Sequence, residues 1–246
     1  MKQSTPSACG GRCGFSLIEL VVIVAIIMIL AMMLMPNFRS ARHSVDRVNC
    51  ATRQRECING LLLYAGDNQQ FLPPVGHHRN WRGLGYEEWW MYRRWVGAYV
   101  NILTTNQFEI AQCPSVRRSN IMLAGIGYNH QQLGIWLGPA TQERVVGNQP
   151  QLFNIRAPAD TVVFADSAWI TNPSATNPAA WYSLGNADHL FRTPDNPQYA
   201  SSPQRAYNRH QDRLVAAFAD GHVSVLSVTN LGFQYPLNHP LAKWDL

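Results

Sequence analysis

The feature that most constrains this chain is an apolar run near its amino terminus. It reads FSLIELVVIVAIIMILAMMLM from Phe15 to Met35 and contains one charged residue, Glu19. As a helix rising 1.5 Å per residue, this run would be about 30 Å long, which matches the hydrocarbon core of a membrane. We therefore expect a transmembrane helix over 15–35. A carboxylate inside such a helix costs about 2.5–3.5 kcal/mol, so Glu19 is expected to have a partner or a task.

A secretory signal peptide is the simplest alternative explanation of the apolar run. The apolar part of a signal peptide is commonly about 7–15 residues long and ends at a small-residue cleavage site. The run in this chain is longer, contains an acid and ends in Met-Leu-Met-Pro. These features favour a segment that is kept in the mature protein.

The start of the run carries a dense local motif, Gly14-Phe15-Ser16-Leu17-Ile18-Glu19-Leu20. It resembles the prepilin peptidase site of type IV pilins and type II secretion pseudopilins. The resemblance implies that a prepilin peptidase removes residues 1–14 by cutting after Gly14, and that the new terminal Phe15 is N-methylated. It implies that Glu19 pairs with the terminal amine of a neighbouring pilin subunit during filament assembly. Pro36 stands where such helices often carry a kink.

The pairing of Glu19 with an amine has a physical reason. An ammonium group and a carboxylate are each costly in an apolar filament core, and pairing them offsets the cost and fixes the register between subunits. The resemblance also implies a single-pass protein of the inner (cytoplasmic) membrane, with its head outside the cytoplasm and in a periplasmic or surface filament after assembly. Positive charges lie on both sides of the run, so they do not by themselves give its orientation.

Beyond Pro36 the sequence becomes amphipathic, which predicts that the helix continues over 36–66. Asp67-Asn68 and the following Pro73-Pro74 are typical of its end. Residues 67–246 would then form a globular head. The expected fold is α+β and pilin-like, a long helix packed on an antiparallel sheet.

Several head segments resemble a large pilin-like family with a shared head domain. They include the stretch from Cys50 to Pro74 and the later Cys113-Pro114. His210, followed after nine residues by Asp220-Gly221, resembles the motif of a prepilin-processing-associated domain. We expect these three motif residues to have structural roles.

The strands around Asp220-Gly221 predict a hairpin with a two-residue type I′ turn. In that register Phe218 lies opposite Val223 and Ala216 opposite Val225, which gives one apolar face. Residues 161–165, ending at Asp166, predict a central strand, and residues 170–209 predict a long surface excursion with little regular structure.

Cleavage would leave Cys50, Cys57 and Cys113 in the mature chain. Cys50 and Cys113 occupy the two family segments that carry cysteine, so we expect a disulfide between them in an oxidising compartment. Cys57, two helical turns from Cys50, is the alternative partner of Cys113. The cysteines form no CxxC pair and the acids form no calcium loop, so we expect no metal and no cofactor.

Parts of the sequence also suit two other function classes, a membrane-anchored enzyme and an adhesin. His210, Asp166, Asp220 and Ser167 contain the residue types of a hydrolase, but the chain has no GxSxG, HExxH, Walker or GxGxxG motif, so we expect no enzyme. The aromatic stretch 81–99 suits an adhesin that binds a surface glycan. We expect instead that Trp89, Tyr92 or Trp95, and Tyr99 form one buried helical stripe. The formal charge of +5 is too small to indicate a nucleic-acid partner.

Overall fold

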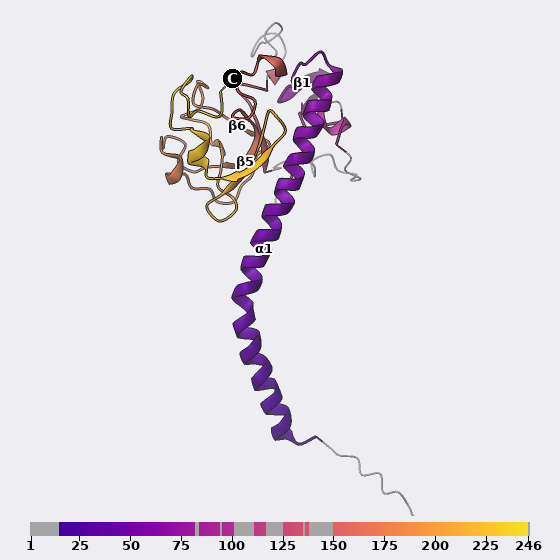
Figure 1. Cartoon of the computed structure of the whole chain (residues 1–246), viewed down its shortest axis with the longest axis vertical. Helices are drawn as coiled ribbons and strands as arrows, with labels where there is room; N and C mark the ends of the chain where they lie inside the picture. The colour runs from indigo at the N-terminus through magenta and orange to yellow at the C-terminus, as the bar shows by residue number, and fades with distance from the viewer. Residues whose placement is uncertain are drawn as a thin grey trace, which may run out of the picture. The chain divides into compact units, whose positions relative to one another are not determined.

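The computed structural model describes residues 15–81, 84–93, 95–100, 111–116, 125–134, 136–137 and 150–245. The chain divides into two compact units, Met1–Arg42 and His43–Leu246. The first unit is the amino-terminal part of helix α1. The second contains the rest of that helix and the head (Figure 1).

Helix α1 spans Leu17–Asp67, and its side chains are described at 17–33 and 41–67. Within the part of the chain whose side chains are described, no helix combines the length and hydrophobicity that a membrane crossing needs. The expected transmembrane helix, and with it the single-pass inner-membrane localisation, is therefore contradicted. Pro36, the expected kink, lies among residues 34–40, whose side chains fall outside the described set.

The second half of α1 is amphipathic, as its sequence predicts. Its buried face recurs every three or four residues, at Cys50, Gln54, Cys57, Ile58, Leu61 and Ala65. This spacing puts the six side chains on one side of the helix. The helix ends where Asn68 donates a side-chain hydrogen bond to the carbonyl of Tyr64 and the chain turns through Gln69 and Gln70, which both have positive φ.

The head is built from short strands and 3₁₀ turns. The strands are β1 (Gly76–Trp81), β2 (Leu84–Trp89), β3 (Ile126–Asn129), β4 (Trp136–Leu137), β5 (Val162–Trp169), β6 (Leu190–Phe191), β7 (Gln204–Ala206), β8 (Leu214–Phe218) and β9 (Val223–Leu226). The 3₁₀ turns are η1 (Val96–Ala98), η3 (Leu152–Asn154), η4 (Pro178–Ala180) and η5 (Val228–Leu231). β1, β2 and β4 form a small sheet.

The larger sheet has six strands in the order β6-β3-β5-β8-β9, with β7 also pairing with β5. Its pairs are antiparallel except for β3 and β6, which run parallel. The sheet is therefore mixed, and the prediction of an antiparallel sheet was wrong. A parallel pair needs a long crossover, and the chain between β3 and β6 contains β5, so no local turn signal could reveal it.

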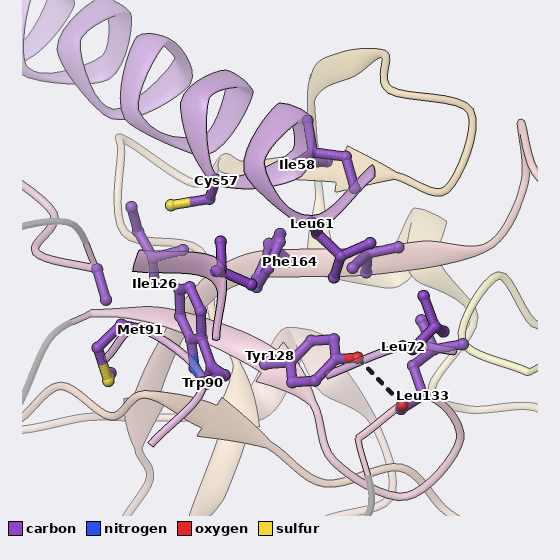
Figure 2. Packing of buried hydrophobic residues seen from close by; sticks show 14 of the residues in the cluster. Cys57, Ile58, Leu61, Leu72, Trp90, Met91, Ile126, Tyr128, Leu133 and Phe164 are labelled. Carbon is purple, nitrogen blue, oxygen red and sulfur yellow. Dashed lines mark hydrogen bonds between the residues drawn. The ribbon is translucent and has the colours of Figure 1, made fainter. Parts of the chain in front are cut away.

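The six-stranded sheet is buried on both faces. Along β8, Val215 and Ala217 point into the cluster beneath α1, and Leu214, Ala216 and Phe218 point into a second cluster. Figure 2 shows Ile58 and Leu61 of α1 directed toward Phe164 of β5. A register shift between Val162 and Phe164 lets Val163 and Phe164 both join the cluster beneath α1.

The second cluster corrects the prediction for residues 170–209. This segment contributes Trp181, Phe191 and Ala206 to the second cluster, together with the carboxy-terminal Trp244 and Phe233. Arg205 is also fully buried, and its guanidinium lies 3.6 Å from the centre of the Tyr199 ring. It donates to backbone carbonyls of the surrounding coil, including those of Ser202 and Pro173. The segment is a packed layer whose regular structure is limited to η4 and the short strands β6 and β7.

The carboxy-terminal hairpin exists, but its turn differs from the prediction. Ala217 pairs with Val223 and Val215 with Val225, so the register is shifted by one residue. Gly221 has φ +93° and donates to the carbonyl of Phe218, while Asp220 is not among the residues with positive φ. This is a three-residue loop with glycine in the left-handed position, and it moves Val223 to the face opposite Phe218.

Candidate functional site

The first candidate site is the amino-terminal end of α1. Gly14 lies outside the described residues, and Phe15 is 75% exposed. The backbone N–H of Ser16 donates to the carboxylate of Glu19 at 2.8 Å. Because the helix begins at Leu17, Ser16 is its N-cap and Glu19 its third residue, the two positions of a capping box. Glu19 therefore has a local partner within its own chain.

The apolar side chains of this unit are exposed on every side of the helix. Exposed fractions run from 42% at Ile23 to 81% at Leu17 among the large apolar residues between Phe15 and Met33. Phe15, Ile18, Glu19, Val22 and Ile23 line a shallow concavity that combines the carboxylate with apolar surface. A helix that is apolar all round is normally buried, so this surface needs a covering partner.

The second candidate site is a buried polar cluster in the head, formed by Cys50, Cys113, Asp166 and His210. Each residue comes from a different element. Cys50 lies on the inner face of α1, Cys113 follows the bridge between Gln112 and Gly125, Asp166 lies in β5, and His210 precedes β8. At 0–2% exposure all four are buried, and one potential ligand atom of each lies within 4.8 Å of those of the others.

The contacts within the cluster run in a chain. The thiol of Cys50 donates to Oδ1 of Asp166 at 3.0 Å. Oδ2 of Asp166 lies 3.3 Å from Nε2 of His210, and that nitrogen lies 3.5 Å from Sγ of Cys113. Oδ2 also accepts the backbone N–H of Val215 at 2.8 Å. The cluster thus joins α1, the central strand and the last hairpin.

The charges in the cluster follow from burial and from these contacts. Burial lowers the pKa of His210, but the hydrogen bonds to Asp166 and Cys113 outweigh it and raise that pKa to about 9. Burial raises the pKa of Cys113, yet hydrogen bonds from Cys50 and His210 bring it down to about 7. Burial raises the pKa of Cys50 well above its ordinary value. At neutral pH Cys113 is partly thiolate, beside an imidazolium and a carboxylate.

Polar groups outside the cluster fix its side chains. Oγ of Ser115 lies 3.3 Å from Nδ1 of His210, which leaves Nε2 turned toward the sulfur and the carboxylate. Nε2 of Gln54 donates to the carbonyl of Val215 at 2.9 Å and lies 3.8 Å from Sγ of Cys50. The positive charge of Arg209 also acts on Cys113 and lowers its pKa. Such supports orient ligand or catalytic atoms.

The structure separates the residues that the sequence offered as one catalytic set. His210 and Asp166 meet in the cluster, but Ser167 donates its hydroxyl to the carbonyl of Asp188 at 2.6 Å. Asp220 accepts from the backbone N–H of His222 at 3.0 Å and contacts its ring, as a turn residue does. No nucleophile–base–acid triad is assembled from these four residues.

The cysteines predicted to form a disulfide are neighbours in the cluster. Cys50, Cys57 and Cys113 are all reduced in the structure, and the Cys50–Cys113 disulfide stays a prediction. Cys57 is buried farther along α1 and does not belong to the cluster. Burial raises its pKa to a value outside the physiological range.

Sequence analysis did not find the four-residue cluster. Cys50, Cys113 and His210 lie in separate motif segments, and the hydrolase residue types include His210 and Asp166 but neither cysteine. The four residues span 160 positions, from 50 to 210. Metal and catalytic motifs are recognised by short spacing, which this set lacks. The one feature that points to the cluster is that Cys50, Cys113 and His210 all lie in segments that resemble the same pilin-like head domain.

The aromatic stretch is mostly interior where its side chains are described. Trp90 is fully buried, donates to the carbonyl of His189 at 2.7 Å and packs on Phe164 with ring centres 4.6 Å apart. Trp95 meets Tyr64 edge to face. The stretch forms β2, a turn and η1, so the expected helical stripe is wrong. The side chains expected in it, Trp89, Tyr92, Trp95 and Tyr99, are half-buried, and the fully buried tryptophan is their neighbour Trp90.

No protein-family model, curated protein or solved structure matches this chain.

Proposed function

We propose that this chain is a pilin-like subunit, cut after Gly14 by a prepilin-type peptidase and assembled into a filament through its amino-terminal helix. The observation that carries the proposal is the exposed apolar surface between Phe15 and Met33, which includes Leu17 at 81% and Ile18 at 69% exposure. The occupant that fits this surface is the same segment of another copy. Helices of this kind cover one another along their length in a filament core.

Charge complementarity supports packing between copies. Cleavage after Gly14 creates an amine at Phe15, four residues before the single carboxylate of the segment, Glu19. In the single subunit this carboxylate caps its own helix through Ser16. In an apolar filament core it would pair with the amine of a neighbouring copy, which offsets the cost of burying both charges. Residues Gly14 to Leu20 carry the resemblance to a prepilin peptidase site.

The cleavage half of the proposal is tested by expressing the full chain with a prepilin peptidase and measuring the amino terminus by mass spectrometry. We expect a mature chain that begins at methylated Phe15, and a Gly14→Val precursor that stays at full length. A mature start at any other residue contradicts the proposal.

The assembly half is tested by a photo-crosslinking amino acid placed at Val22, with Leu184 of the head as the control. Both positions are exposed, at 51% and 73%. We expect ladders of crosslinked subunits from position 22 and none from position 184, and we expect Glu19→Gln to be cut normally but to lose the ladder. Crosslinks from position 22 that reach lipid alone would show that the helix is covered by something other than its copies.

A further inference from the structure

We propose that Cys50, Cys113, Asp166 and His210 bind a transition-metal dication of the zinc class. Each residue offers one ligand atom, and all four ligand atoms lie within 4.8 Å of one another. All four side chains are buried, and they come from α1, a loop, β5 and the approach to β8. Four donors of three chemical types that converge from separate elements make an enclosed site.

The spacing of the donors fits a tetrahedral ion. Zinc bonds of about 2.3 Å to sulfur and about 2.0–2.1 Å to nitrogen or oxygen place neighbouring ligand atoms roughly 3.3–3.8 Å apart. The distances from Asp166 to His210 and from His210 to Cys113 are 3.3 and 3.5 Å. Sγ of Cys50 lies 3.0 Å from Oδ1, the other oxygen of the Asp166 carboxylate, so the cysteine would shift relative to the carboxylate as a metal replaces the thiol proton.

The donor types select the metal. Two thiolates, one imidazole and one carboxylate suit zinc, whereas calcium requires six to eight oxygen ligands and magnesium an octahedron of oxygens. The contact of Ser115 with Nδ1 of His210 holds the ring by its far nitrogen and leaves Nε2 as the ligand. The backbone N–H of Val215 donates to Oδ2 of Asp166, the oxygen that lies 3.3 Å from His210, and fixes the carboxylate.

The charges also fit a bound dication. Two thiolates and a carboxylate carry three negative charges, and His210 is neutral as a ligand. A dication would therefore leave a net charge of −1, and the positive charge of Arg209 already acts on Cys113. Binding would release the protons of both thiols and of the imidazolium. Without a metal, the same donors would form a buried hydrogen-bond network or a Cys50–Cys113 disulfide. These three states are mutually exclusive at the two sulfur atoms.

The experiment begins with the full-length chain purified under reducing conditions and supplied with zinc alone. We expect about one tightly held zinc per chain by elemental analysis. X-ray absorption should show a first shell of two sulfur and two nitrogen or oxygen atoms. Replacing zinc with Co²⁺ should give a thiolate charge-transfer band and the intense visible bands of a tetrahedral site. These spectra use the unmodified chain, so they stand even if a variant does not fold.

The matched variants are Cys113→Ser and Cys57→Ser, which both remove a buried thiol of the core beneath α1. We expect the first to reduce bound zinc to background and the second to keep the full content. Equal zinc content in both variants overturns the proposal, as does an unmodified chain with no zinc and no cobalt band. A Cys50–Cys113 disulfide in the protein as isolated from its own cells, found by peptide mapping, also overturns it.

Discussion

The two halves of helix α1 place the same residue type in opposite environments. Leu30 is 55% exposed, whereas Leu61, in the same helix, is 0% exposed. The first half is apolar on every side and belongs to the unit Met1–Arg42. The second half is apolar on one face, and the head covers that face. The comparison shows that one chain can cover the apolar face of an amphipathic helix by itself. A helix that is apolar on all sides needs another molecule to cover it.

The largest expected effect comes from removing a buried charge in the head. Asp166→Ala should lower the free energy of unfolding by about 3–5 kcal/mol, because it leaves His210 and the N–H of Val215 buried without their partner. Urea unfolding of the full chain measures this loss. The control is Asp220→Ala, whose exposed contact with His222 should contribute less than about 1 kcal/mol. Similar losses in both variants would contradict the buried network.

The same substitution in the two halves of α1 tests the comparison directly. Leu61→Ala should cost about 2–5 kcal/mol, since it opens a cavity beneath the helix. Leu30→Ala should change the stability of the isolated subunit by less than about 0.5 kcal/mol, since its side chain is solvated. In the proposed filament Leu30 would be buried, so the difference between the stability losses of the two variants should be smaller there. A Leu30→Ala subunit that unfolds as easily as Leu61→Ala would break the comparison.

Local patterns in the sequence were enough for several elements. The amphipathic spacing of the second half of α1 and its end at Asp67 follow from helix periodicity and a turn signal. The strand through residues 161–165 is present as the start of β5. Each of these features depends on residues that are close together in the sequence. Intrinsic preference and pattern therefore agree with the final fold.

Features that depend on distant contacts could not be predicted. Asp-Gly suits both a two-residue turn and a three-residue loop, and only packing of Phe218 against the second cluster selects the register. The polar composition of 170–209 predicted a surface segment, but Trp181 and Phe191 anchor it. The length and composition of the apolar run predicted a membrane helix, which the described part of the chain does not contain.

A smaller effect is expected at the loop of the last hairpin. Gly221→Val should cost about 1–3 kcal/mol, because a branched side chain is forced to positive φ. A Cβ at this position would also lie 3.3 Å from the side chain of Leu62. Gly185 has φ +94° with nothing within 4 Å, so Gly185→Val reports backbone strain alone. Thermal melts of both variants should show the larger loss at Gly221, and the reverse order would contradict its packing against α1.

The smallest effect is a pH dependence that arises in the head. Burial, followed by the charges of Arg192 and His189, lowers the pKa of His130 to about 4. The folded pKa is below the unfolded value of about 6.5, so the folded protein favours the uncharged ring. The stability that this provides is complete above about pH 6.5 and is lost as the pH falls toward 4. Because the ring is partly exposed, we expect a loss of roughly 1–2 kcal/mol.

His130→Gln is the matched test of this pH dependence. Urea unfolding at pH 7 and pH 4.5 gives the free energy of unfolding at each pH. The loss between the two pH values should be smaller in the variant than in the original chain, by roughly 1–2 kcal/mol. Identical pH profiles for the two proteins would show that the ring titrates as it does in water.

The wide sequence separation of the contacts on α1 sets the order in which this protein can fold. Gln54 bonds to Val215, and Cys50 bonds to Asp166. During synthesis at about 5–20 residues per second, the inner face of the helix must wait for more than half of the chain before its covering strands exist. Closing loops this long is slow, because chain entropy is lost before native contacts compensate for it. The nascent chain therefore also exposes the inner face of the second half of α1 until translation is nearly complete, and binding to a chaperone is the natural protection during that interval.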